Sequence, residues 1–454
     1  MTLTSPAQRI LGLIPNESDA PRLVADLLTT TDGIIELQPE FVPRDFLLPG
    51  RRLGIAIEDQ YSYGPHRGAL SERWIGSCTV CDNGPLTLPY EGISKAVFMG
   101  QRIPLTWICG EQPKKVLGHL AEIFNVVPGY YNKLFDFYRH IPHHLHQQAA
   151  KSFANGKPCM LGKQRMGKHE GYKHLTQYNH PLMAGEQVAT WFGLRPGTTI
   201  DDLVRAFEEW NVCDNRILRY AQAQLIGPHV NWFVPSDYLH APGPMITEEP
   251  QEGTDVFSMF QNVVEGKYTP DALLKKNYDP RIQSDPAALA AAVDLELNAR
   301  NPHEFMIHPS VKQRADEFVE SWEVFGRDPH DGYIPFVLLE TVIGPKKSVI
   351  LRGESFHSVF CVEGVGTIGN PSGRVRFPIR APRSFRFGEA SNDEYLITAE
   401  RAFDGVRFEN TAETPLVLHR CFGRNAFADK DVPQVGLAHR RDPEELIRAR
   451  AAIM

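Results

Sequence analysis

The chain has 454 residues, of which 42% are hydrophobic and 23% are charged, and its formal net charge at pH 7 is −7. This composition excludes a disordered chain, and the length is expected to supply two or three folding units. The acidic balance leaves no basic stripe for nucleic acid. No apolar run reaches the roughly 18 residues of a membrane helix and the start lacks a targeting leader, so we expect a cytoplasmic protein without a membrane partner.

The first 125 residues combine helical and strand-like segments. Residues 1–49 are expected to form a leader that packs on the next unit, with a helix at Ala20–Leu28 and a strand at Gly33–Leu37. From residue 50, short apolar runs such as Leu53–Ile57 and Ile103–Ile108 alternate with Gly, Pro and Asp-Asn-Gly turns, which is typical of all-β folds. The sequence therefore predicts a mainly β unit over residues 50–265.

The seven cysteines are an odd number scattered along the chain, so we expect them to be reduced rather than paired in disulfides. Cys78 and Cys81 form a single Cys-x-x-Cys, and a structural zinc site would need a second pair that the chain does not supply. We interpret this segment as a loop that follows Glu72–Ser77 and could cover a ligand site.

Four potential metal ligands occur in order in the middle of the first unit: His144, His146, Glu170 and His240. The two histidines at 144 and 146 would share one face of a strand and form a chelating pair. Lys168 and Glu170 fit a second strand, and the strand-like Val230–Pro235 leads to His240. Three imidazoles and one carboxylate suit zinc, iron, manganese, cobalt or nickel without deciding among them. Five nearby histidines are alternative ligands: His140, His143, His169, His174 and His180.

The remaining elements alternate between helix and strand. Thr199–Trp210 predicts an amphipathic helix capped by Thr199. Residues 266–330 predict a helical connector, because its helix starts carry Pro at the first helical position. Strand patterns return over 331–425, and residues 426–454 are expected to form a tail that ends in a helix. The 331–425 unit has His357, Glu363 and His419 but no His-x-His, so we expect no metal there.

Four segments of the first unit carry recognisable patterns: Glu72–Ser77, Gly167–Glu170, Trp191–Thr199 and Phe233–Ala241. In order, they are similar to the Glu-x-Trp-x-Gly, Gly-Lys-x-Glu, Gly-Phe-x-Pro-Gly and Val-Pro-x-x-x-x-His-Ala patterns of one family. This part of the chain therefore resembles class I mannose-6-phosphate isomerases of the cupin superfamily. Two departures accompany these patterns. The family's first ligand is usually glutamine where this chain has His144, and Ser258–Asn262 replaces an arginine-containing segment.

The resemblance implies a mainly β fold built from two cupin-like β-barrels, a bicupin, with inserted and connecting helices. Residues 50–265 would form the metal-binding barrel and 331–425 a second, degenerate one. It also implies one divalent transition metal, with zinc the first expectation, held by the four ligands named above.

The activity that the resemblance implies is a metal-dependent isomerase of a sugar or sugar phosphate, which interconverts aldose and ketose through an enediolate. Four residues are unranked candidates for moving the proton: Lys168, Glu248, Glu249 and Asp255. No arginine or lysine lies between His240 and Lys267, and the acids there favour the hydroxyls of an unphosphorylated sugar over a phosphate. The alternative for these acids is a solvated loop.

Two other functions fit the same residues. Another metal-dependent cupin enzyme, such as a dioxygenase, would consume oxygen, whereas an isomerase would not. A non-catalytic sugar-binding bicupin would bind a sugar without exchanging its C2 proton. In each case the partner is a small carbohydrate or other small molecule, and exposed sheet edges are compatible with a homodimer.

Overall fold

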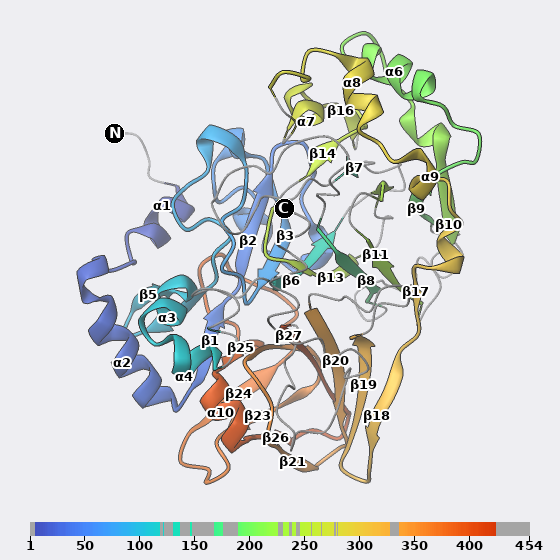
Figure 1. Ribbon diagram of the computed structural model, residues 1–454. Helices are drawn as coiled ribbons and strands as arrows, with labels where there is room; N and C mark the ends of the chain where they lie inside the picture. The colour runs from blue at the N-terminus through green and yellow to red at the C-terminus, as the bar shows by residue number, and fades with distance from the viewer. Residues whose placement is uncertain are drawn as a thin grey trace.

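The computed structural model shows a mainly β molecule, as predicted, with helices at the periphery (Figure 1). The structure describes residues 5–118, 121, 130–136, 146–147, 168–175, 189–225, 230–235, 238–241, 246–255, 257–264, 266–276, 278, 280–326 and 336–423. Two pairs of sheets account for nearly all of its strands. We call the sheets that contain β8 and β9 the first half, and the sheets that contain β20 and β23 the second half.

The first half consists of a seven-stranded and a five-stranded sheet. The larger sheet has the order β17 (Ile307–His308), β11 (Asn231–Val234), β8 (Glu170–His174), β13 (Ile246–Glu252), β6 (Tyr130–Asp136), β3 (Ala69–Ile75) and β2 (Glu40–Arg44). The smaller has the order β10 (Ala221–Leu225), β9 (Ala189–Leu194), β12 (His240–Ala241), β7 (His146–Gln147) and β14 (Ser258–Met259). Tyr172 and Trp232 from one sheet pack with Phe192 and Met259 from the other in a single core.

The second half, in the lower part of Figure 1, consists of a nine-stranded and a four-stranded sheet. The larger has the order β18 (Val311–Ala315), β19 (Val319–Phe325), β20 (Phe336–Ile343), β27 (Leu416–Gly423), β22 (His357–Glu363), β25 (Glu394–Ile397), β1 (Ile34–Gln38), β4 (Lys95–Phe98) and β5 (Gln101–Pro104). The smaller has the order β21 (Ser348–Leu351), β26 (Val406–Asn410), β23 (Val365–Gly369) and β24 (Arg376–Arg380). Val359 and Leu418 pack with Ile368 and Phe408 between them.

Both larger sheets and both smaller ones are open at their ends in the part of the chain that the structure describes. The strands confirm the mainly β class, but closure of the sheets into two barrels stays a prediction. A short two-stranded sheet of β15 (Val263–Val264) and β16 (Lys267–Tyr268) completes the strands. The helix predicted at the end of the tail lies outside the described residues.

The N-terminal segment joins both halves instead of packing on the first alone. Its helices are α1 (Pro6–Leu11) and α2 (Ala20–Thr31), the second of which confirms the predicted helix. Strand β1 pairs with β25 in the second half, and β2 pairs with β3 in the first half. The chain therefore contributes a strand to each half near its start, and this segment links the two halves.

Two of the predicted strands are wrong. Over Leu53–Ile57 the chain forms 3₁₀ turns with one isolated bridge, between Ile55 and Phe385. Over Ile103–Ile108, β5 stops at Pro104 and helix α3 (Leu105–Glu111) begins. The apolar run there is buried as one helix face, in which Leu105, Ile108 and Cys109 are inaccessible, so apolar content alone did not distinguish strand from helix.

The other helices follow the sequence more closely. Thr199 caps α6 (Ile200–Glu208) through a capping box with Asp202, as predicted. The 266–330 segment contains α7 (Ala272–Lys275), α8 (Pro286–Ala291) and α9 (Leu295–Asn298), but from Ile307 it forms strands β17 to β19. The prediction of a helical connector is therefore correct only for its first part. The remaining α-helices in the described residues are α4 (Pro113–Leu117) and α10 (Ala399–Asp404).

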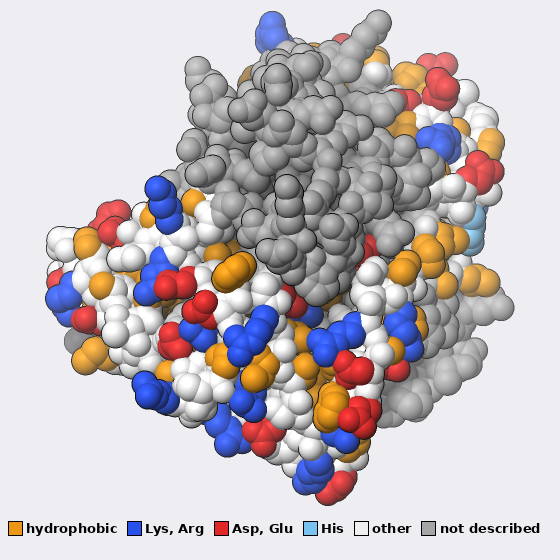
Figure 2. Space-filling view, turned by 60° about the horizontal axis from the view of Figure 1, so that its bottom comes forward, with side chains coloured by type: hydrophobic (Ala, Val, Ile, Leu, Met, Phe, Trp, Pro, Cys, Tyr) orange, Lys and Arg blue, Asp and Glu red, His pale blue; other side chains and the backbone are white. Residues whose placement is uncertain are grey.

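One face of the described surface mixes both signs of charge. On the face turned to the viewer in Figure 2, the described basic and acidic side chains are interspersed and the apolar ones are scattered among them. Such a face produces no strong field of a single sign. In the described part of the chain, no helix is long and apolar enough to cross a membrane.

Candidate metal centre

The centre of the first half is a pair of strands with two chemically different faces. Strands β8 and β13 are antiparallel, with Glu170 opposite Gln251 and Lys173 opposite Glu248. Since side chains alternate along a strand, Glu170 and Gln251 share one face while Lys173 and Glu248 share the other. Tyr172 shows which face is internal, because its ring packs against Phe192 of the five-stranded sheet. We call this the inner face.

The opposite face of the same strands is covered by the second half. A Cβ built on Gly171 would lie 2.7 Å from the ring of Phe325 in β19, so only glycine allows this approach. Lys173, two residues further, forms an ion pair of 2.9 Å with Glu340 in β20. We call this the outer face of β8 and β13, although it is buried between the halves.

Two of the predicted metal ligands meet on the inner face. His240 Nε2 lies 3.1 Å from Glu170 Oε2, and both side chains are almost completely buried. The other ring nitrogen, His240 Nδ1, lies 2.8 Å from the carbonyl oxygen of Tyr238 and therefore carries the proton. This hydrogen bond fixes the tautomer in which Nε2 presents its lone pair towards Glu170.

The backbone places a third predicted ligand beside them. His146 in β7 is the register partner of His240 in β12, and directly opposite positions of an antiparallel ladder lie on the same face of a sheet. His144, the fourth predicted ligand, lies outside the described residues. Within the described side chains, no group of three or more His, Cys, Asp and Glu is close enough to hold a metal ion.

The Glu170 and His240 atoms fit a zinc-sized ion. Two ligand atoms that each lie about 2.0–2.2 Å from one zinc ion are roughly 2.8–3.5 Å apart at coordination angles between square and tetrahedral. The observed separation of 3.1 Å falls in this interval. A carboxylate oxygen and an imidazole lone pair also repel each other unless a proton or a cation lies between them, so the donor set itself suits a cation.

Lys168 is the predicted catalytic candidate that lies nearest to these ligands. Its Nζ lies 3.0 Å from Glu170 Oε1 and donates a hydrogen bond of 2.6 Å to Gln251 Oε1. Gln251 is fully buried and was not predicted as a site residue. Gln251 lies opposite Glu170 in the neighbouring strand. Only this strand register identifies it as a site residue, and the register cannot be read from the sequence.

Glu249 and Glu248 are adjacent in the chain but face opposite ways. Glu249 shares the inner face with Gln251, and burial raises the pKa of Tyr172 well above its ordinary value while the nearby charges of Glu249 and Glu170 raise it further. Glu248 is on the outer face, where His419 Nδ1 from β27 is hydrogen-bonded to its Oε2. The structure therefore places Glu249, and not Glu248, beside the predicted ligands.

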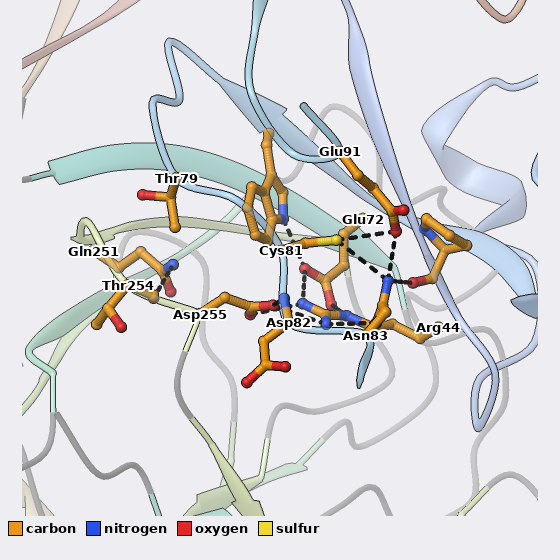
Figure 3. A network of polar contacts seen from close by, with 12 residues as sticks. Arg44, Glu72, Thr79, Cys81, Asp82, Asn83, Glu91, Gln251, Thr254 and Asp255 are labelled. Atoms are coloured by element: carbon orange, nitrogen blue, oxygen red, sulfur yellow. Dashed lines mark hydrogen bonds and ion pairs between the residues drawn. The ribbon is translucent and has the colours of Figure 1, made fainter. Parts of the chain in front are cut away.

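Asp255 takes part in a separate buried network with Arg44 (Figure 3). Arg44 Nη2 donates to Asp255 Oδ1 at 2.8 Å, and Arg44 Nε donates to Glu72 Oε1 at 2.7 Å. Trp74 Nε1 also donates to Glu72, and the backbone amide of Asp82 donates to Asp255 Oδ2. Burial would raise the pKa of Asp255, but the charge and hydrogen bonds of Arg44, with the charge of Lys276, together lower this pKa below its ordinary value.

Two of the acids between His240 and Lys267 are paired with cationic side chains, Glu248 with His419 and Asp255 with Arg44. Glu252 accepts a hydrogen bond from the backbone amide of His169, and Glu249 is buried on the inner face. The expected repulsion of a phosphate by these acids is therefore weakened for Glu248 and Asp255, but not for Glu249. Glu72, which belongs to one of the segments with a family resemblance, is part of the Arg44 network. The Cys78–Cys81 loop leads directly to Asp82, whose backbone amide also belongs to this network.

Comparisons with known proteins identify the fold but not a sequence family. No protein-family model matches the sequence, and no curated protein matches it. Solved structures of phosphomannose isomerases share its fold. A variant of phosphomannose isomerase from Salmonella typhimurium has a TM-score of 0.53 and 13% identity, covering 86% of this chain and 100% of its own. A mannose 6-phosphate isomerase with zinc bound gives the same four values, and a second Salmonella typhimurium variant has a TM-score of 0.52 and 12% identity.

The resemblance predicted from the sequence is confirmed at the level of fold. At 12% to 13% identity the shared architecture says nothing of shared chemistry. The chemistry must be argued from the inner face, where Glu170, His240 and Lys168 lie together.

Proposed function

We propose that this protein is a metal-dependent isomerase that interconverts an aldose and a ketose, as free sugar or sugar phosphate, in a bicupin fold. The observation that carries the proposal is the buried contact between Glu170 and His240, with the histidine tautomer fixed by Tyr238. Its setting adds support, since solved structures with this fold include a zinc-bound mannose 6-phosphate isomerase.

We assign the metal ligands to Glu170, His240, His146 and His144, and the ion to a divalent transition metal, with zinc first. When bound, such an ion would polarise the carbonyl and neighbouring hydroxyl oxygens of the sugar. Tyr238 holds the His240 ring in the ligating tautomer, and Lys168 holds the second oxygen of Glu170. These contacts keep the ligands oriented whether or not the ion is present.

The proton transfer between C1 and C2 is assigned to the inner face. Glu249 is a buried carboxylate beside Tyr172 and can accept and return the proton. The Lys168 ammonium, held by Gln251, can stabilise the negative charge that develops on the sugar oxygens. Glu248 and Asp255, the other two candidates, are engaged by His419 and Arg44, and we assign them structural roles.

The proposal is tested by metal content and hydrogen exchange on the same preparations. Elemental mass spectrometry of untagged protein is expected to find about one equivalent of a transition metal, which a His146→Ala, His240→Ala double variant lacks. The wild type should incorporate solvent deuterium at C2 of an aldohexose or its 6-phosphate, and the double variant should not. A matched double variant at exposed histidines, His66→Ala with His303→Ala, should retain both properties.

Three outcomes would overturn the proposal. Protein that binds no metal after incubation with zinc, manganese and iron is not a metalloenzyme of this kind. Metal binding with oxygen consumption, and without deuterium at C2, would identify the alternative cupin dioxygenase. Sugar binding without either reaction would identify a non-catalytic binding protein.

A further inference from the structure

Four charged side chains form a cluster behind the inner face, which we call the interface cluster: Lys173, Glu248, Glu340 and His419. Glu248 and His419 are fully buried, whereas Lys173 and Glu340 are partly exposed. The first two project from the outer face of β8 and β13 in the first half. The other two lie opposite each other in β20 and β27 of the second half. The cluster therefore spans the boundary between the halves directly behind the strands that carry Glu170 and Glu249.

His419 is the centre of this cluster. Its Nδ1 is hydrogen-bonded to Glu248 Oε2, and its Nε2 lies 3.0 Å from Glu340 Oε2. Carboxylate oxygens only accept hydrogen bonds, so both ring nitrogens donate and the imidazolium form is favoured. Although burial disfavours the charged ring, the pKa of His419 is raised by the charge of Glu248 and by its hydrogen bonds.

Lys173, in β8, is the fourth member of the interface cluster. Its Nζ lies 2.9 Å from Glu340 Oε2, the same oxygen that accepts from His419. Burial would raise the pKa of Glu340, but the hydrogen bond and charge of His419 lower it far below its ordinary value. The cluster thus contains two cations and two anions, and it joins β13 to β8 through Glu340 of the second half.

The interface cluster affects the inner face because inner-face and outer-face residues alternate along the same two strands, β8 and β13. Glu248 is followed by Glu249, and Lys173 is preceded by Tyr172 and lies three residues after Glu170. A shift of β13 relative to β8 would separate Lys173 from Glu248, which are opposite each other. Because displacements of about 1 Å in an active site can cost roughly a hundredfold in rate, fixing these strands from behind has a direct catalytic consequence.

We infer that His419 and Glu340 are positioning residues, through which the second half holds Glu249 and Glu170 in register for the reaction. This inference rests on the proposed function for its catalytic part, whereas its structural part concerns β8 and β13 alone. Neither residue touches the inner face, so neither is a catalytic residue. The second half then serves as a rigid support for the reacting strands.

The test compares His419→Gln with Glu354→Gln. Glu354 accepts two hydrogen bonds of 2.6 Å from Arg420, the residue after His419, so the control also breaks a buried charge contact of β27, but away from the interface cluster. Hydrogen–deuterium exchange is measured over residues 168–175 and 246–252, and kcat and KM are measured with the aldose that the wild type uses.

His419→Gln is expected to raise amide exchange in both segments at least about tenfold and to lower kcat between about ten- and a hundredfold with KM nearly unchanged. Glu354→Gln is expected to leave both segments and kcat as in the wild type. Equal exchange in the two variants would overturn the inference.

One further variant keeps the result decisive. Glu340→Gln changes the most exposed member of the cluster, and it replaces His419→Gln if that variant fails to fold. If the wild type has no isomerase activity, the proposed function fails, while the exchange data still decide whether the second half fixes β8 and β13.

Discussion

The two halves of the molecule contain histidines with the same local geometry and different surroundings. In the first half, His240 Nδ1 lies 2.8 Å from the carbonyl oxygen of Tyr238, two residues earlier. In the second half, His357 Nδ1 lies 2.7 Å from the carbonyl oxygen of Ser355, again two residues earlier. Both rings are therefore fixed as the tautomer whose Nε2 can accept, and both are almost completely buried.

The two histidines differ in the groups that surround the ring and its second nitrogen, Nε2. His240 Nε2 faces a carboxylate oxygen of Glu170, whereas the His357 ring stacks on Phe422 at 4.3 Å. Burial lowers the pKa of His357 to about 4; the negative charge of Glu354 opposes this shift, and the positive charge of Arg420 adds to it. The carboxylate of Glu354 is paired with Arg420, whereas Glu170 directs an oxygen at His240 Nε2. An oriented imidazole is thus not sufficient for a cation site, which also requires a carboxylate oxygen directed at the second ring nitrogen.

The largest expected effect separates these two histidines by metal binding. His240→Ala should weaken zinc binding by at least about a hundredfold, because it removes a ligand and not merely a supporting contact. His357→Ala should change zinc affinity less than twofold. Competition titration against a chromogenic chelator measures both. Similar losses in the two variants would place the metal elsewhere and contradict the assignment of the first half.

A second comparison concerns one buried arginine from each half. Arg44 neutralises two carboxylates, Glu72 and Asp255, whereas Arg420 neutralises one, Glu354. Because removing one partner leaves an uncompensated buried charge, Arg44→Met is expected to cost about 3–5 kcal/mol in the free energy of unfolding. Arg420→Met should cost less, since the Glu354 side chain is 10% exposed. Urea denaturation measures both, and a larger loss for Arg420→Met would contradict this ranking.

The pH dependence of stability distinguishes two histidines within the second half. The pKa of His419 is raised on folding, so its contribution is present below its unfolded value of 6.5 and is lost as pH rises through the folded pKa. The pKa of His357 is lowered to about 4, so the unfolded state binds a proton first and stability falls as pH drops from 6.5 towards 4.

Each variant should therefore flatten a different limb of the stability profile. His357→Gln is expected to reduce the acid-side loss, which amounts to about 1.4 kcal/mol per pH unit for one such group. His419→Gln is expected to reduce the loss on the alkaline side. Urea denaturation from about pH 5 to about pH 8 measures both limbs. A change on the same limb in both variants would contradict the assigned directions.

The sequence predicted the parts of the site that depend on order and local spacing. Glu170 and His240 were expected to converge because each lies in or directly after a strand-like segment, and the structure brings them together. The mainly β class and the capped helix after Thr199 were predictable for the same reason. These features depend on periodicity and on residues close in the chain.

The roles of the acids could not be predicted in this way. The segment Thr-Glu-Glu-Pro-Gln-Glu has no apolar alternation, so nothing in it indicates that Glu249 faces inwards and Glu248 outwards. Arg44 is 211 residues away from Asp255, and no local pattern links them. The pairing of β1 with β25 joins residues even further apart in sequence, such as Ile34 and Ile397, so the leader could not be assigned to the second half.

The smallest expected effect compares a helix cap in each half. Thr199 caps α6, and its backbone and side-chain hydrogen bonds lower the pKa of its capping-box partner Asp202 to about 2. Thr398 caps α10 by accepting from the Arg401 amide, and it is buried against Gly33. Thr199→Ala should cost about 1 kcal/mol, which is typical of a lost cap.

Thr398→Ala should cost more than Thr199→Ala, because it loses packing as well as the cap, while Thr199→Ser should restore most of the stability lost in Thr199→Ala. Urea denaturation measures all three variants. Equal losses for the two alanine variants would mean that the cap alone determines the cost, and that the contact between Thr398 and the turn before β1 adds nothing to the stability of the second half.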